Sequence, residues 1–245
     1  MPPQKEYVFI GKSLFFPEEG ILVIGDLHIG YEAMLRQSGV LVPARQVKDI
    51  IEDFKKIFAE IKEQKYDLRK IVFIGDIKHA FGYESEEKNE FQEVLSFLGE
   101  HLPQENIILI KGNHDTVDYT FEGLMKQFYI YEGILFVHGH KKIKEIRDKE
   151  IKTIVFGHIH PCILFEESAK KEAYKCFLTG KYLGKEVIVL PSFLGFVEGT
   201  AVNDYREDYI ESFSIIPKKD IMDFEIHAVG DDKIYEFGKV KSYQR

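Results

Sequence analysis

A chain of 245 residues with 44% hydrophobic and 30% charged residues is long enough for one large globular domain or two small ones. Its net charge of -8 argues against a broad surface that wraps nucleic acid, although bound cations can still create a local anion site. No apolar run approaches the roughly 18 residues of a membrane span, and the N-terminus lacks the apolar core of a signal peptide. Two cysteines cannot form a disulfide framework, so we expect a cytoplasmic protein without a membrane partner.

Five short apolar runs predict buried strands, because a parallel strand covered on both faces is a continuous apolar run. These runs are residues 21–24, 71–74, 107–110, 134–137 and 154–156. Helical patterns lie between them. Residues 47–61 form one apolar stripe, a second helix is expected over 86–101, a third over 121–128, and a short one near 142–148.

The pattern changes after residue 162. Residues 162–165, 174–178 and 187–190 are typical of antiparallel strands, with a turn near Gly184, and 234–237 is a last strand candidate. The first two thirds therefore indicate βαβ units and the last third a meander. Since no long linker interrupts the chain, we expect one domain over residues 1–245.

The five predicted strands all end in polar loops, and these loops contain seven of the nine histidines. The loops read Gly-Asp26-Leu-His28, Gly-Asp76-Ile-Lys-His79, Gly-Asn113-His114-Asp115, His138-Gly-His140 and Gly-His158-Ile-His160. Loops at the carboxyl ends of strands are where α/β proteins build their sites. We therefore expect these side chains to lie close together.

Seven side chains in these loops are candidate metal ligands: Asp26, His28, Asp76, Asn113, His138, His158 and His160. Carboxylates and imidazoles suit Mn, Fe or Zn, and the absence of cysteine disfavours a structural thiolate zinc site. Seven donors are too many for one ion with open positions, but they suit two ions that share a carboxylate. His114 is a candidate for proton chemistry, and Asp115 could either orient it or accept hydrogen bonds that stabilise the loop.

In this order, over residues 25–160, the motifs resemble those of the calcineurin-like metallophosphoesterase superfamily: Asp-x-His, Gly-Asp-x-x-Asp/Asn, Gly-Asn-His-Asp/Glu, a lone His and Gly-His-x-His. The resemblance implies an α/β fold, a four-layer αββα sandwich of two mixed sheets flanked by helices. It implies one ion held by Asp26, His28, Asp76 and His160. It implies a second held by Asp76, Asn113, His138 and His158, with Asp76 bridging and His114 in the catalytic position.

His79 stands where the wider family often has Asp or Asn, and this departure is similar to the SbcD-like nucleases, whose histidine here supports phosphodiester cleavage. With the phrases Gly-Asp-Leu-His-Ile-Gly-Tyr-Glu and Val-Leu-Pro-Ser-Phe, the chain resembles small SbcD-related archaeal phosphoesterases and bacterial PdeM-type proteins. His79 either assists catalysis or hydrogen-bonds a neighbouring ligand. His140 has no necessary ligand position, so a supporting role and a solvated one both stay open.

The resemblance therefore predicts a hydrolase that uses two divalent ions, Mn²⁺ first, with Fe, Zn or Ni as alternatives. A hydroxide bridging the metals would attack a phosphodiester in line, nucleic acid being a candidate substrate, with His114, His79 and Asp115 as catalytic residues. One alternative is a small-molecule phosphatase or cyclic-nucleotide phosphodiesterase. Another is a binding scaffold of the same fold that has lost the chemistry, which loss of several ligands would mark.

Overall fold

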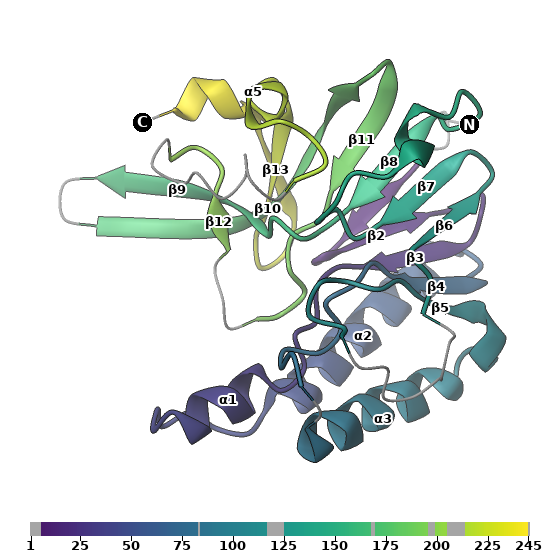
Figure 1. Ribbon diagram of the computed structural model, residues 1–245, viewed down its shortest axis with the longest axis vertical. Helices are drawn as coiled ribbons and strands as arrows, with labels where there is room; N and C mark the ends of the chain where they lie inside the picture. Colours follow the sequence, from purple (N-terminus) through teal and green to yellow (C-terminus); the bar gives the residue numbers. More distant parts are fainter. Residues whose placement is uncertain are drawn as a thin grey trace.

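In the computed structural model, described for residues 6–82, 84–116, 125–167, 170–195, 199–204 and 214–244, two β-sheets lie face to face (Figure 1). The helices α2 and α3 cover the outer face of the first sheet, and short helical segments lie against the second. This layering confirms the expected sandwich of two mixed sheets. Among the described residues, no helix is both long and apolar enough to cross a membrane.

The first sheet has the strand order β1-β2-β3-β4-β5, with β3, β4 and β5 parallel to one another and β1 and β2 antiparallel. Its strands are β1 (Val8–Ile10), β2 (Ser13–Phe16), β3 (Ile21–Ile24), β4 (Lys70–Phe73) and β5 (Ile107–Leu109). The helical connections are α1 (Tyr31–Gln37), α2 (Gln46–Glu63), α3 (Ser85–Gly99) and η1 (Gln104–Asn106).

The second sheet has the order β12-β9-β10-β11-β8-β7-β6, and β13 pairs with both β10 and β14. Its strands are β6 (Phe128–Tyr131), β7 (Ile134–Val137), β8 (Thr153–Phe156), β9 (Pro161–Glu167), β10 (Lys170–Tyr182), β11 (Lys185–Val189), β12 (Thr200–Ala201), β13 (Glu225–Val229) and β14 (Ile234–Lys239). The remaining helical segments are η2 (Lys144–Arg147), α5 (Lys218–Ile221) and η3 (Val240–Tyr243). The strands β7, β8 and β11 are parallel to one another. The strand β10 pairs antiparallel with β11 and with β9, so the sheet is mixed.

Alternation along the strands divides the apolar residues among three layers of core. In β3, Leu22 and Ile24 face the helices, whereas Ile21 and Val23 pack between the two sheets. The strand β11 alternates in the same way between the intersheet core and a third cluster beneath α5 and η3. Because both faces are covered, these strands are apolar throughout, which is why their sequences were recognisable.

The five predicted strands and the two long helices are confirmed, with small shifts at their ends. Part of the helix expected over 121–128 lies outside the described residues, and its last residue instead begins the strand β6. The short helix expected near 142–148 is a 3-10 turn, η2. Cys162 and Cys176 are both buried and are not joined by a disulfide bond.

Candidate metal centre

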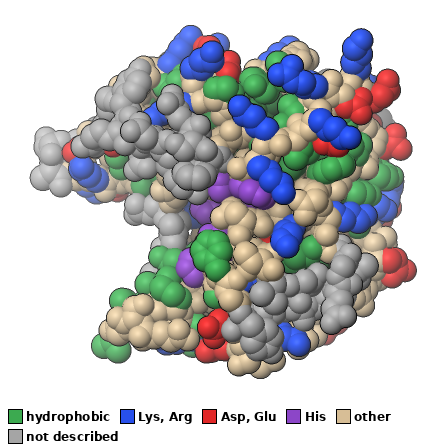
Figure 2. Space-filling model, viewed as in Figure 1, with side chains coloured by type: hydrophobic (Ala, Val, Ile, Leu, Met, Phe, Trp, Pro, Cys, Tyr) green, Lys and Arg blue, Asp and Glu red, His purple; other side chains and the backbone are tan. Residues whose placement is uncertain are grey.

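The loops that follow β3, β4, β5, β7 and β8 converge beside the ends of the two sheets, because their strands are parallel within each sheet. Figure 2 shows histidine side chains at the inner end of a hollow in the molecular surface. The first two loops are tied together, since the His28 amide donates a 2.9 Å hydrogen bond to the Asp76 carbonyl. Residues distant in sequence thus meet at one place.

One group of donors consists of Asp26, His28, Asp76 and His160, whose ligand atoms lie within 4.8 Å of one another. The Nε2 atoms of His28 and His160 are 3.3 Å apart, and His160 Nε2 lies 3.1 Å from Asp26 Oδ1. Donors bound to one ion at about 2.1 Å, with tetrahedral or octahedral angles, lie roughly 3.0–3.4 Å apart. These spacings therefore fit a shared cation.

A second group consists of Asp76, His138 and His158, again within 4.8 Å. His138 Nε2 lies 3.3 Å from Asp76 Oδ2 and 3.0 Å from the Oδ1 atom of Asn113. Asp76 thus belongs to both groups, which is the arrangement that a bridging carboxylate requires. The two groups contain six of the seven predicted ligands, and the seventh, Asn113, contacts His138 of the second group.

Backbone contacts orient the donors of the centre. His138 Nδ1 lies 2.9 Å from the Ile74 carbonyl, and because a carbonyl can only accept, this nitrogen carries the proton and Nε2 faces Asp76. The amide of His158 donates to Asp26 at 3.2 Å, and that of His114 to Asp76 at 2.9 Å. Such supporting contacts fix ring and carboxylate orientation before any ion binds.

Glycines precede the ligands because each loop packs closely against its neighbours. Gly75 has a φ of +104°, and a Cβ atom there would lie 2.6 Å from His138 Nδ1. A Cβ atom on Gly112 would overlap the carboxylate of Asp76. A side chain at either position would therefore displace a candidate ligand that belongs to another loop.

Four of the candidate ligands have left-handed backbones: His28, Asp76, His158 and His160, with φ values of 45°, 46°, 65° and 43°. This conformation costs a residue other than glycine about 1–3 kcal/mol and is concentrated at functional sites. Here the surrounding loops hold it in place. The strain is consistent with a site whose donor geometry takes precedence over local backbone preference.

Burial sets the protonation of the donors. It lowers the pKa of both His28 and His158 to about 3, so these rings are neutral, which is the form that binds metals. Burial alone would also lower the pKa of His138, but hydrogen bonding to Asp76 and the nearby carboxylate charges raise it to about 9. Burial opposes ionisation of Asp26 and Asp76, yet the neighbouring histidines hold the pKa of each below its usual range.

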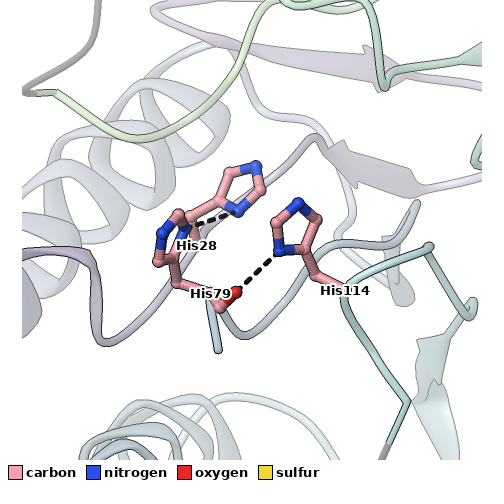
Figure 3. Close-up of side chains that lie close together, drawn as sticks. All are labelled: His28, His79 and His114. Atoms are coloured by element: carbon pink, nitrogen blue, oxygen red, sulfur yellow. Dashed lines mark hydrogen bonds between the residues drawn. The ribbon is translucent and has the colours of Figure 1, made fainter. Parts of the chain in front are cut away.

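Figure 3 shows that His28, His79 and His114 lie close together, and His28 also belongs to the first group of donors. The ring centroids of His28 and His114 are 4.9 Å apart. His114 Nδ1 lies 2.6 Å from the main-chain carbonyl of His79, and the Nδ1 atoms of His79 and His28 lie 3.4 Å apart. The carbonyl fixes the orientation of the His114 ring through Nδ1, and Nε2 takes no part in that contact.

Residues 20–161 match the calcineurin-like phosphoesterase family, over a stretch that contains every donor described above. The chain belongs to this family. No curated protein gave a match. The chain is similar in fold to the crystal structure of the nuclease MPE from Pseudomonas putida, with a TM-score of 0.61, 17% identity and 94% of each chain covered.

Two other solved structures were also found by comparison. One is vacuolar protein sorting 29 from Cryptosporidium parvum, with a TM-score of 0.38 and 16% identity over 89% of this chain and 97% of that one. The other is a predicted phosphoesterase from Streptococcus pneumoniae TIGR4, with a TM-score of 0.34 and 14% identity over 89% and 97%.

In this candidate centre the contacts of Asp115 distinguish between the two roles expected for it. Its buried carboxylate accepts hydrogen bonds from the amides of Gly112 at 2.8 Å, Ile77 at 3.1 Å and Lys78 at 3.2 Å. Burial raises the pKa of Asp115 to about 6. Asp115 therefore has the loop-stabilising role, since it ties the third loop to the second, and the His79 carbonyl is the acceptor beside His114.

His140 lies outside both groups of donors, with its ring centroid 5.2 Å from that of His138. The structure adds supporting residues that sequence reasoning missed. The hydroxyl of Ser192 and the amide of Phe193 donate to the Asp26 carbonyl at 3.2 and 3.1 Å, and Lys175 Nζ donates to the Ser192 carbonyl at 3.0 Å. The only sequence signal for this segment was the Val-Leu-Pro-Ser-Phe phrase that follows an apolar run.

Proposed function

We propose that this phosphoesterase hydrolyses phosphodiesters with the help of two divalent cations, acting on nucleotide-containing substrates in the manner of a nuclease. The observation that carries the proposal is the position of Asp76 in both groups of donors, each within 4.8 Å. A site for one isolated ion would not need a shared carboxylate. Carboxylate and imidazole donors favour manganese first, with iron, zinc or nickel as alternatives.

When bound, two such cations lower the pKa of a coordinated water and neutralise charge on the attacking and leaving oxygens. The chain's own part is to hold them. Asp26 and Asp76 contribute two negative charges, and the neutral rings of His28 and His158 add donors without adding charge. The net positive charge of the filled site then attracts a phosphate even in an acidic protein.

His114 transfers the proton to the leaving oxygen. Its Nδ1–H donates to the His79 carbonyl, so Nε2 carries a proton only in the imidazolium form. As the bond from phosphorus to the leaving oxygen breaks, the Nε2 proton passes to that oxygen and the ring becomes neutral.

The preference for diesters over monoesters is supported by His79, which lies beside His28 and His114. The related fold of a protein named as a nuclease also supports it. Phosphatase or cyclic-nucleotide activity would appear as faster turnover of those small substrates than of single-stranded DNA or bis(p-nitrophenyl) phosphate.

The test is turnover of bis(p-nitrophenyl) phosphate by metal-free protein supplied with Mn²⁺, together with the number of ions bound. We expect the wild-type protein to bind two equivalents of metal and to show metal-dependent turnover. We expect Asp76→Asn to lose the two-ion binding and the turnover. Asp67→Asn is the control, because Asp67 is an exposed partner of Arg69 outside the donor groups. A folded protein that binds no second ion, or that gives no metal-dependent turnover, would contradict the proposal.

A further inference from the structure

An exposed aromatic ring lies against the His114 imidazole. Phe81 follows His79 in the loop after β4, and 60% of its surface is exposed. Its ring stacks on His114 with a centroid distance of 4.3 Å and an interplanar angle of 28°. Single exposed apolar residues are common on proteins. The position of this ring, rather than its exposure, is what requires an explanation.

The loop that carries Phe81 is fixed by hydrogen bonds from both sides. The ammonium group of Lys78 donates to the carbonyls of Ala80 and Gly82, the latter at 3.1 Å. The hydroxyl of Thr116 donates to the carbonyl of Phe81 itself. The ring is therefore held in one place relative to the third loop.

Glu87 of α3 adds a third restraint. Its Oε1 atom accepts hydrogen bonds from the amides of His79 at 2.7 Å and Ala80 at 2.8 Å. The restraints on this loop thus come from α3, from the third loop and from the loop's own lysine. These restraints hold the ring of Phe81 in a position where most of it is exposed to water, so its hydrophobic burial contributes little to folding.

The His114 ring lies between the Phe81 ring and the candidate metal ligand His28 in a chain of ring contacts. His114, on which Phe81 stacks, is 4.9 Å from His28 by ring centroids, and His28 belongs to the first group of donors. A phosphate at the metal centre would thus carry its neighbouring substituent toward a flat apolar surface. Aromatic side chains beside a phosphate site commonly stack nucleobases.

We propose that Phe81 is the stacking platform for the nucleobase next to the phosphate held at the metal centre. This inference rests on the proposed function and names its substrate class as nucleotides, as opposed to phosphate esters without a base. Every base has a face that can stack, so the platform selects for a base and not for one sequence. Recognition by stacking also suits a chain with a net charge of -8, which offers little general attraction for a polyanion.

The experiment is calorimetric binding to the Mn²⁺-loaded full chain. The probes are thymidine 5′-phosphate, thymidine 3′-phosphate and 2-deoxyribose 5-phosphate, which lacks a base. We expect at least one thymidine phosphate to bind about tenfold more tightly than the sugar phosphate, the size of one stacking contact. Phe81→Leu should remove that ratio, and Phe81→Trp should keep it. Tyr235→Leu is the control, because Tyr235 is 47% exposed on β14, outside the centre.

Thermal unfolding of each variant shows whether it is folded. Equal affinity for the three probes in the wild-type protein would overturn the proposal, as would an unchanged ratio in Phe81→Leu. Turnover of bis(p-nitrophenyl) phosphate separates this result from the proposed function. Metal-dependent turnover without a base preference refutes the platform alone, whereas a Phe81-dependent base preference without turnover of any diester refutes the phosphodiesterase alone.

Discussion

Replacing Gly75 by alanine adds one methyl group at the point where the second loop packs against His138. Two penalties follow. The φ of +104° is unfavourable for alanine, and the added Cβ would lie 2.6 Å from His138 Nδ1 and 2.9 Å from the Gly112 Cα. Gly39 has a similar φ of +85° but has no atom within 4 Å of an added Cβ. Gly39→Ala therefore has the unfavourable backbone conformation but not the steric collision.

The collision can be estimated from these distances. Cβ contacts below 3.0 Å essentially never occur, so His138 Nδ1 must retreat by about 0.4 Å. Metal sites tolerate about 0.2 Å in ligand distance, so we expect metal affinity to fall roughly 10- to 100-fold. Backbone strain should cost each variant about 1–2 kcal/mol. Overpacking should cost Gly75→Ala a further 1–3 kcal/mol or so.

The assays are thermal unfolding of the metal-free variants and calorimetric titration with Mn²⁺. Gly75→Ala should unfold at a lower temperature than Gly39→Ala and bind metal more weakly, while Gly39→Ala should bind metal like the wild-type protein. If the two variants have equal stability and equal metal affinity, the close packing of the second loop on His138 does not support the centre as argued.

Three further predictions concern stability. Raising free Mn²⁺ to 100 times its dissociation constant should stabilise the protein by about 2.7 kcal/mol for each ion bound, or roughly 5–10 °C in melting temperature per ion, and chelation should reverse this; an unchanged melting temperature with metal bound would be the contrary result. Asp115→Asn replaces one of the two carboxylate oxygens that together accept from three amides and should cost about 1–3 kcal/mol in urea unfolding, whereas a cost near zero would exclude the loop tie. Burial, aided by Lys12, lowers the pKa of Lys175 to about 7, so from pH 7 to about 10 the unfolded chain binds a proton that the folded chain does not. Wild-type stability should therefore rise relative to Lys175→Met by up to about 1 kcal/mol per pH unit over that range, and parallel pH curves for the two proteins would contradict the shift.

The strands that carry the site were predictable because their signal is local. Residues 21–24 and 154–156 are apolar throughout, since each strand is covered on both faces. The hairpin of β1 and β2 and the seven-residue helix α1 were not predicted. The helix α1 has Gly30 as its N-cap and no side-chain cap hydrogen bond, so its start has no sequence signature.

Asp115 shows where adjacency in sequence leaves a role open. Asp115 follows His114 in the chain, so its carboxylate could support the imidazole or stabilise the loop. In the folded protein the carboxylate instead accepts from amides of the second and third loops, and the His79 carbonyl contacts the ring. Whether Asp115 or the His79 carbonyl contacts the His114 ring depends on how the second and third loops pack together. That packing cannot be read from the positions of these residues in the sequence.

The sequence by itself determined the kinds of donor and the strand ends from which they come, because both follow from local composition and period. Only the tertiary structure decided which atoms meet. The resemblance had placed Asp76 in both ligand sets, but the folded chain alone shows the contacts that bring it there, and it fixes Phe81 on the face of His114. The contacts of the centre join residues more than 130 positions apart, such as His28 and His160, which are 132 apart, so packing of the two sheets and their loops had to set them.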